Sequence, residues 1–242
     1  MIRAALLFAL AVASTAHADT SVAADAAAAP PARCTYEDGP FWRAYHALTD
    51  DEHRKLAPFD ELRDVSAHYL LYAWALKPSD VRGSRVLDRR THALVRAFDL
   101  GVEALVEDRA GALLGVLALQ RGQLVLIDAR TSKPRWRVAA PAGVRDESFR
   151  ALVDGDRLIL ANYHRYATGS TLFALDLGSG ALRWTAEVEQ MNVAHSEYFN
   201  DVALERRGAT VVMRGFEAAG CYVQTFDLAS GRRLSSAMQR RW

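Results

Sequence analysis

Short apolar runs recur along the chain, and each of them ends in an aspartate that opens a polar turn. The four aspartates, which lie 40, 48 and 51 residues apart, are Asp88, Asp128, Asp176 and Asp227. An aspartate side chain can accept hydrogen bonds from the backbone amides that follow it, and glycine tolerates a positive φ. The sequence Asp-x-x-Ser-Gly after the last two aspartates therefore predicts a tight hairpin turn, followed by a further short strand.

Two more strands are expected before each hairpin. In the third unit they are 149–153 and 157–161, with Asp-Gly-Asp as the turn between them. A unit of four strands that repeats every 40 to 51 residues is typical of β-propeller blades. The runs 124–127, 158–161 and 211–213 are apolar at consecutive positions, as expected of strands that are covered on both faces. The pattern predicts an all-β, propeller-like fold of about four four-stranded antiparallel blades over residues 64–242.

Part of this repeat matches a family motif. The third unit resembles the tryptophan-docking repeat of quinoprotein-type, or PQQ-like, propellers, which reads Ala-x-Asp-x-x-Thr-Gly-x-x-x-Trp. Asp176, Gly180 and Trp184 occupy the motif positions, and Asp128 and Trp136 keep the same spacing in the second unit. The resemblance implies that these five residues have a structural docking role, with each tryptophan packed between adjacent blades.

The other units depart from the motif. Arg96 and Ser235 stand where the first and last units would carry the tryptophan, and Ser132 replaces the glycine of the second unit. Four blades are compatible with a closed ring, with an open arc, or with a homodimer in which two chains complete a larger ring. The sequence leaves these alternatives open.

The N-terminal region has the three parts of a secretory signal. A short positive start is followed by an apolar run over 4–13 and by Ala16-His17-Ala18, so we expect a signal peptide over 1–18 that is cleaved after Ala18. Residues 19–33 are rich in alanine and proline and are expected to form a disordered linker. No later segment is apolar enough to span a bilayer, so the predicted location is the periplasm or the medium.

Residues 34–63 are expected to form a helical cap on the blades. Phe41, Trp42, Tyr45 and Leu48 have the spacing of one helical face, and 49–52 has the pattern of a capping box. The chain has two cysteines, Cys34 and Cys221, and in an oxidising compartment this count favours one disulfide between them over two buried free thiols.

Charge narrows the classes of partner. Without residues 1–18 the chain has 29 basic and 29 acidic side chains, because the signal removes only Arg3. A formally neutral protein gives no support to binding of nucleic acid or of anionic membranes, which requires a basic surface.

Two segments contain candidate binding residues. His195 and Glu197 would project from the same face of an extended segment, where Asp201 could join them around a divalent metal, although a polar loop is the simpler interpretation. His164, Arg165 and Tyr166 lie in a connection between two strands, which suits either a rim that faces a ligand or a solvated turn.

No catalytic motif is present in the sequence. It has no Gly-x-Ser-x-Gly elbow, no glycine-rich phosphate loop and no Cys-x-x-Cys pair, and quinoprotein enzymes have about twice as many blades around their cofactor. We therefore expect no resident cofactor and no catalytic residues. The sequence favours an exported, non-enzymatic binding or scaffold protein with a protein partner, and the alternative is a metal-dependent hydrolase or lyase with its site near His195 and Glu197.

Overall fold

The computed structural model describes residues 34–48, 60–75, 81–145, 148–164, 170–189 and 200–240. Within them, sixteen strands form four sheets, and in each sheet the strands pair antiparallel in chain order. The sheets are named here as blades one to four. Their strands are β1 (Asp60–Val65), β2 (Tyr69–Ala75), β3 (Val81–Asp88) and β4 (Leu94–Phe98); β5 (Ala104–Glu107), β6 (Leu113–Gln120), β7 (Gln123–Asp128) and β8 (Pro134–Ala139); β9 (Ser148–Asp154), β10 (Arg157–Tyr163), β11 (Ser170–Asp176) and β12 (Leu182–Glu187); β13 (Asn200–Arg207), β14 (Thr210–Glu217), β15 (Gly220–Asp227) and β16 (Arg233–Arg240).

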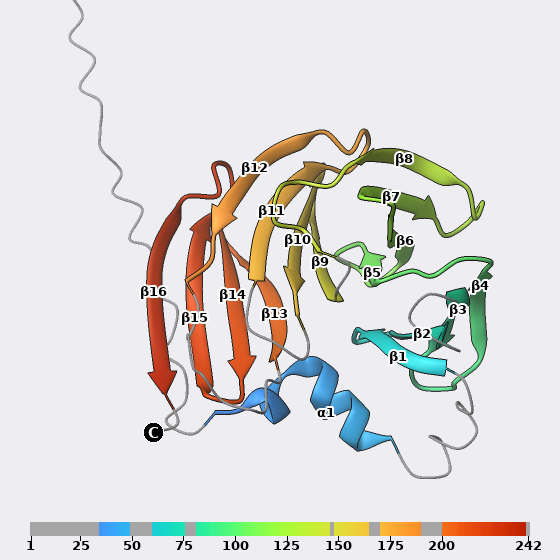
Figure 1. The fold of residues 1–242 in the computed structure, drawn as a ribbon, viewed down its shortest axis with the longest axis horizontal. Coiled ribbons are helices and arrows are strands. Elements are labelled where there is room, and N and C mark those ends of the chain that lie inside the picture. Colours follow the sequence, from blue (N-terminus) through green and yellow to red (C-terminus); the bar gives the residue numbers. More distant parts are fainter. Residues whose placement is uncertain are drawn as a thin grey trace, which may run out of the picture.

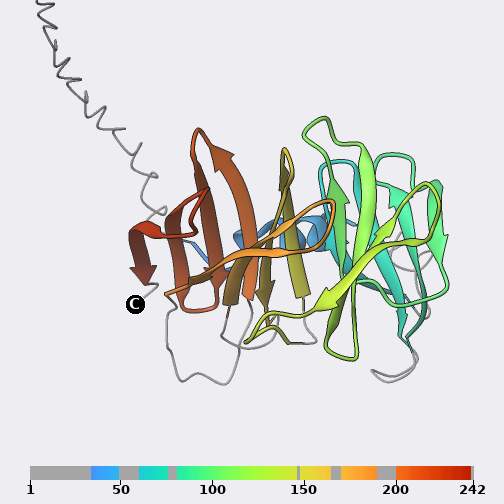
Figure 2. The same ribbon diagram turned by 90° about the horizontal axis from the view of Figure 1, so that it is seen from above.

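The blades lie side by side in an arc (Figure 1). The first strand of each blade lies on the inside of the arc, where β9 contacts β1, β5 and β13. The outer strands β4 and β16 lie on opposite sides of the molecule in both views (Figures 1 and 2), so the arc is open between the first and the fourth blade. The prediction of an all-β, propeller-like fold with four antiparallel blades is confirmed.

The aspartates that define the repeat end the third strand of every blade. Asp176 shows how each turn is built, because its Oδ1 accepts hydrogen bonds from the amide and the hydroxyl of Ser179, both at 2.8 Å. Arg183 donates to the other carboxylate oxygen. The hydrogen bonds from Arg183 and then from Ser179 hold the pKa of Asp176 well below its usual range, so the turn keeps a charged acceptor at neutral pH.

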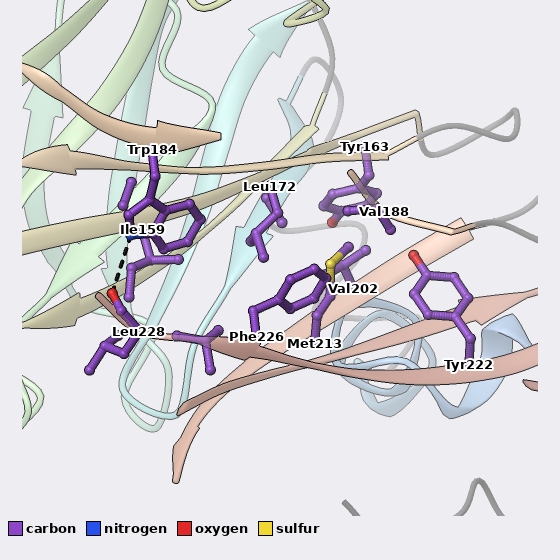
Figure 3. Close-up of a cluster of buried hydrophobic side chains, with 13 residues drawn as sticks. Ile159, Tyr163, Leu172, Trp184, Val188, Val202, Met213, Tyr222, Phe226 and Leu228 are labelled. Carbon is purple, nitrogen blue, oxygen red and sulfur yellow. Dashed lines mark hydrogen bonds between the residues drawn. The ribbon is translucent and has the colours of Figure 1, made fainter. Parts of the chain in front are cut away.

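Neighbouring blades are joined by apolar side chains that face each other across each interface. The strands alternate, so each inner strand gives one set of side chains to the preceding blade and one to the following blade. Three separate buried clusters result, one for each pair of adjacent blades. Figure 3 shows the cluster between blades three and four, with Trp184 and Leu228 at one end and Tyr163 and Tyr222 at the other.

A short helical segment covers the free face of the first blade. The 3₁₀ turn η1 (Tyr36–Asp38) leads into the helix α1 (Pro40–Ala47), which contacts β1 and β13 and so lies between the first and the fourth blade (Figure 1). Phe41 and Trp42 are buried against the first blade, whereas Tyr45 is 40% exposed. The helix therefore takes the place that a further blade would have in a closed ring.

The predicted boundary of the helical cap at residue 63 differs from the structure. Strand β1 begins at Asp60, so the last four residues of the range 34–63 belong to the first blade. The capping-box pattern at 49–52 lies outside the described residues. The capping box that the structure contains is at Thr35, whose amide donates to the carboxylate of Asp38 at 2.9 Å.

A disulfide joins Cys34, just before η1, to Cys221 in β15 of the fourth blade, as the cysteine count predicts. The two residues are 187 positions apart in the chain, and their Cα atoms are 5.7 Å apart. The link holds the start of the helical segment on the last blade, while α1 packs on the first. Among the described residues, no helix has the length and apolar character needed to cross a membrane.

Candidate functional site

A tryptophan of an outer strand joins each of the two later pairs of blades. The indole Nε1 of Trp136 in β8 donates to the carbonyl oxygen of Leu177 at 2.9 Å. Trp184 in β12 donates in the same way to Leu228 at 3.2 Å (Figure 3). Each acceptor directly follows the aspartate of the next blade, so each tryptophan is bound to its neighbour's turn.

The glycine of that turn makes room for the indole ring. Gly180 and Gly231 have φ values of 76° and 71°, in the left-handed region that favours glycine. A Cβ on Gly180 would lie 2.8 Å from the ring of Trp136, and one on Gly231 would lie 2.5 Å from the ring of Trp184. Glycine is therefore required both by the backbone and by the neighbouring tryptophan.

The turn between blades one and two lacks this contact. Arg96 takes the place of the tryptophan and donates to the carbonyl oxygen of Arg130 at 3.3 Å. The turn residue at the glycine position is Ser132, which adopts the same left-handed conformation with a φ of 57°. A side chain is tolerated at this position only where no indole lies on it.

The inner strands of the arc converge on one buried arginine, Arg150 of β9. Its Nε donates to the carbonyl oxygen of Val202 in β13 at 3.0 Å, and its Nη1 donates to that of Val65 in β1 at 2.7 Å. The same guanidinium forms ion pairs with Asp64 of β1 and, at 3.2 Å, with Asp201 of β13. Arg150 thus connects the third blade to both ends of the arc.

The two carboxylates extend this network. Asp64 also accepts from the amide of Leu105 in β5 at 2.8 Å, which brings the second blade into contact with the other three. Asp201 accepts from the Tyr163 hydroxyl at 3.0 Å and from the amide of Phe41 in α1 at 2.6 Å. A carboxylate at a helix N-terminus is electrostatically favourable, so the fourth blade caps α1. The polar groups at the centre of the arc are therefore bound to one another.

A second buried polar group lies between the third and fourth blades. Asn200 begins β13, Glu217 ends β14, and the two residues pair across the strands. Both side chains are buried, and neither has a hydrogen-bond partner within the described part of the chain. Burial raises the pKa of Glu217 to about 7, so its carboxyl is partly protonated near neutral pH.

Most of the sequence-predicted binding residues lie outside the described residues, namely Arg165, Tyr166, His195 and Glu197. His164 follows β10 and is half-buried. Asp201 is fully buried and held by Arg150, Tyr163 and α1, so it is not an available metal ligand. The described residues contain no group of three or more His, Cys, Asp or Glu side chains that could hold a metal ion.

Sequence reasoning missed Arg150, Asp64 and Glu217. In the sequence, Arg150 stands in an apolar run after Phe149, where a single charge resembles the solvent side of a strand. The signal that could have found it is the all-apolar character of this unit, which predicts strands covered on both faces. A charge inside such a strand then requires a buried partner of opposite sign.

Comparison with the curated proteins yields no match. Among solved structures the chain is similar to BamB from Moraxella catarrhalis, with a TM-score of 0.45 and 19% identity over 73% of this chain and 48% of that chain. It is also similar to the quinohemoprotein alcohol dehydrogenase ADHIIG from Pseudomonas putida, with a TM-score of 0.42 and 14% identity over 76% of this chain and 35% of that chain. The chain thus spans less than half the length of either structure.

The motif resemblance to PQQ-like propellers is confirmed at the level of the family. The family model described as outer membrane protein assembly factor BamB matches residues 82–241, which are well over half of the chain and include the last two strands of the first blade and all of the other three blades. The protein therefore belongs to this family of PQQ-type propeller proteins.

Proposed function

We propose that the protein is an exported, non-enzymatic scaffold that binds a protein partner through the surface of its blade arc. The observation that carries the proposal is the centre of the arc, where Arg150, Asp64 and Asp201 bind one another and their neighbours' backbones. These charges stabilise the arrangement of the blades, and their hydrogen-bonding capacity is used within the protein. Recognition is then a property of the outer surface.

Family membership supports a role of this kind, because the matching family is described as an assembly factor. The disulfide supports export, because such bonds persist in oxidising compartments. Together with the expected signal peptide over 1–18 and linker over 19–33, it favours the periplasm or the medium as the location. Intact mass measured without reduction, and N-terminal sequencing of the exported protein, test cleavage after Ala18 and the disulfide together.

The outer strand β4 of the first blade is the surface that we propose for the partner. An edge strand presents unpaired backbone groups, and proteins usually protect such edges with charges or proline. The edges of the second and fourth blades follow this rule, with Pro134 and Arg135 in β8 and Arg233 in β16. The edge strand β12 of the third blade exposes one apolar residue, Leu182, next to Arg183. In β4, by contrast, Leu94 and Val95 are 59% and 43% exposed. An extended segment of a partner with apolar side chains would pair with this edge.

The test is a pull-down from periplasmic extract at native salt, with the full exported chain as bait. The variant Leu94→Lys/Val95→Lys should lose the captured partner. The matched control is Leu182→Lys in β12, because Leu182 has the equivalent place in the third blade and is 53% exposed. Recovery of no specific protein contradicts the scaffold role. Equal capture by both variants instead leaves the scaffold role in place and excludes β4 as the contact.

A further inference from the structure

The pair Asn200 and Glu217 points to a ligand site inside the interface between blades three and four. Directly opposed residues of antiparallel strands project their side chains to the same face. Val202 and Met213 have the same orientation on β13 and β14, and both belong to the cluster between these blades. Asn200 and Glu217 therefore face the third blade. Glu217 pairs with Gly220 at the start of β15, whereas Trp184 binds Leu228 just after the end of β15, so the pair lies at the opposite end of the interface from Trp184.

The state of these two side chains is unusual for a folded protein. Asn200 is 1% exposed and Glu217 is 3% exposed. Neither the oxygen nor the nitrogen of the amide, and neither carboxylate oxygen, has a hydrogen-bond partner within the described residues. Buried polar atoms are almost always hydrogen-bonded, because leaving them unpaired costs free energy. Two such groups on adjacent strands indicate a place where a bound group supplies contacts to their oxygen atoms.

The walls of this place supply more oxygen atoms. Gly215 has no side chain, so the ring of Tyr222 lies directly over the β14 backbone, where a Cβ would collide with it. The Tyr222 hydroxyl is 3.5 Å from Ser170 Oγ of the third blade. Tyr222 pairs with Gly215, two positions before Glu217 on β14, so Tyr222 and Glu217 lie on the same face of the blade. Burial, and secondly the charge of Glu217, raise the pKa of Tyr222, so the hydroxyl stays protonated.

No described cation neutralises Glu217. Arg150, which is buried at the centre of the arc, is paired with Asp64 and Asp201. Arg214 lies on the opposite face of β14, because successive side chains alternate along a strand. The site thus combines one negative charge with neutral acceptors, and it matches a ligand with a single positive charge.

We propose that Glu217, Asn200 and Tyr222 bind a primary ammonium group, which belongs either to a small amine or to a lysine side chain of a partner. An ammonium has one charge and three donors, which correspond to one carboxylate, one amide oxygen and one hydroxyl oxygen. A guanidinium presents a planar fork suited to bidentate pairing with a carboxylate. A divalent metal would leave an uncompensated charge in a buried place. The site does not depend on the partner surface proposed on β4.

The experiment measures the thermal unfolding midpoint of the full exported chain at pH 8, where the Glu217 carboxylate is mostly ionised. The probes are methylammonium chloride and Nα-acetyl-lysine methylamide, with tetramethylammonium, sodium and calcium chlorides at equal ionic strength as controls. We expect a saturable rise of the midpoint with the first two probes only. A response to methylammonium alone identifies a small-amine site, and a response to both probes identifies a site that admits a lysine side chain.

Glu217→Gln should abolish the rise, and circular dichroism should show that this variant keeps its strands. The matched control is Glu205→Gln in the same blade, which removes a half-exposed carboxylate paired with Arg207 and should respond like the wild type. An equal rise with tetramethylammonium, a rise with the metal chlorides instead, no saturable rise with either amine, or an unchanged response of Glu217→Gln overturns the proposal.

Discussion

The two interfaces between blades two, three and four are held by different chemistry from the links that join the first blade to the fourth. Between blades two, three and four, a tryptophan of one blade lies on the turn glycine of the next and donates to its backbone. At the ends there is no such contact, and the helix α1, the disulfide and the Arg150 network take its place. Blade docking is thus a local device between neighbours in the chain, whereas the first and the fourth blade are held by links between residues far apart in the sequence.

The largest loss of stability is expected when Arg150, which links the third blade to the first and the fourth, is replaced. Arg150→Met should lower the free energy of unfolding by about 5 kcal/mol, because it leaves the carboxylates of Asp64 and Asp201 buried without their cation. Urea titration of the wild type and the variant measures the change. A loss below about 1 kcal/mol would show that the arc does not depend on this network.

Trp184→Ala tests the tryptophan-docked interface between the third and the fourth blade. It should cost about 3–5 kcal/mol, the usual loss for truncating a buried aromatic side chain. Arg96→Ala, at the equivalent place in the first blade, is the control and should cost much less, because the Arg96 side chain is only half-buried. Denaturation midpoints of the two variants check this, and equal losses would remove the distinction between docked and undocked interfaces.

The stability of the docked interface between blades three and four should depend on pH through Glu217. The pKa of Glu217 is about 7 in the folded protein, against an ordinary value of 4.5. The folded state therefore holds its proton at pH values where the unfolded state has lost it, so the free energy of unfolding falls as the pH rises from about 4.5 to about 7. The fall should approach about 3 kcal/mol, since each unit of pKa difference corresponds to about 1.4 kcal/mol.

Glu217→Gln isolates this contribution. The variant should lose the fall and, at pH 8 without ligand, be the more stable protein. Urea titrations at pH 5 and pH 8 give the change in the free energy of unfolding of each protein between the two pH values. The other titrating groups contribute equally to both proteins, so the difference between the two changes is due to Glu217. Parallel pH profiles for the two proteins would contradict the burial of an unpaired carboxyl.

The smallest expected effect comes from the undocked turn. Ser132 has a φ of 57°, a conformation that costs a residue with a side chain about 1 kcal/mol relative to glycine. Ser132→Gly should therefore stabilise the protein by about 0.5–1 kcal/mol. Gly180→Ser is the reverse change in a docked turn, and it should destabilise the protein because Trp136 occupies the space. Thermal midpoints check both signs.

The sequence predicts the blades well because their signals are local. Asp176, Ser179 and Gly180 lie within five positions, and their roles in a turn follow from their own backbone chemistry. The centre of the arc was not predictable in this way. Arg150 meets Asp64 across 86 positions and Asp201 across 51, and no periodicity links such residues.

The candidate binding residues show the same limit. His195 and Glu197 are candidate ligands because a histidine and a glutamate are conspicuous in a polar segment, but both lie outside the described residues. Glu217 sits between alternating strand residues and resembles a solvent-facing position. Its burial follows from the third blade, which is contributed by a distant part of the chain.

The fifth residue of each turn is glycine or another residue according to whether the preceding blade places an indole on that turn. Glycine occupies this position only where an indole lies on the turn. The first blade has His92 at the glycine position and the last blade has Ser235 at the tryptophan position, so neither end of the array has the residue needed to dock a further blade. Lengthening the array by one module would therefore require Ser235→Trp together with an incoming glycine turn. A circular version would need the same pair at Ser235 and His92 and, in addition, removal of α1 from between the first and the fourth blade.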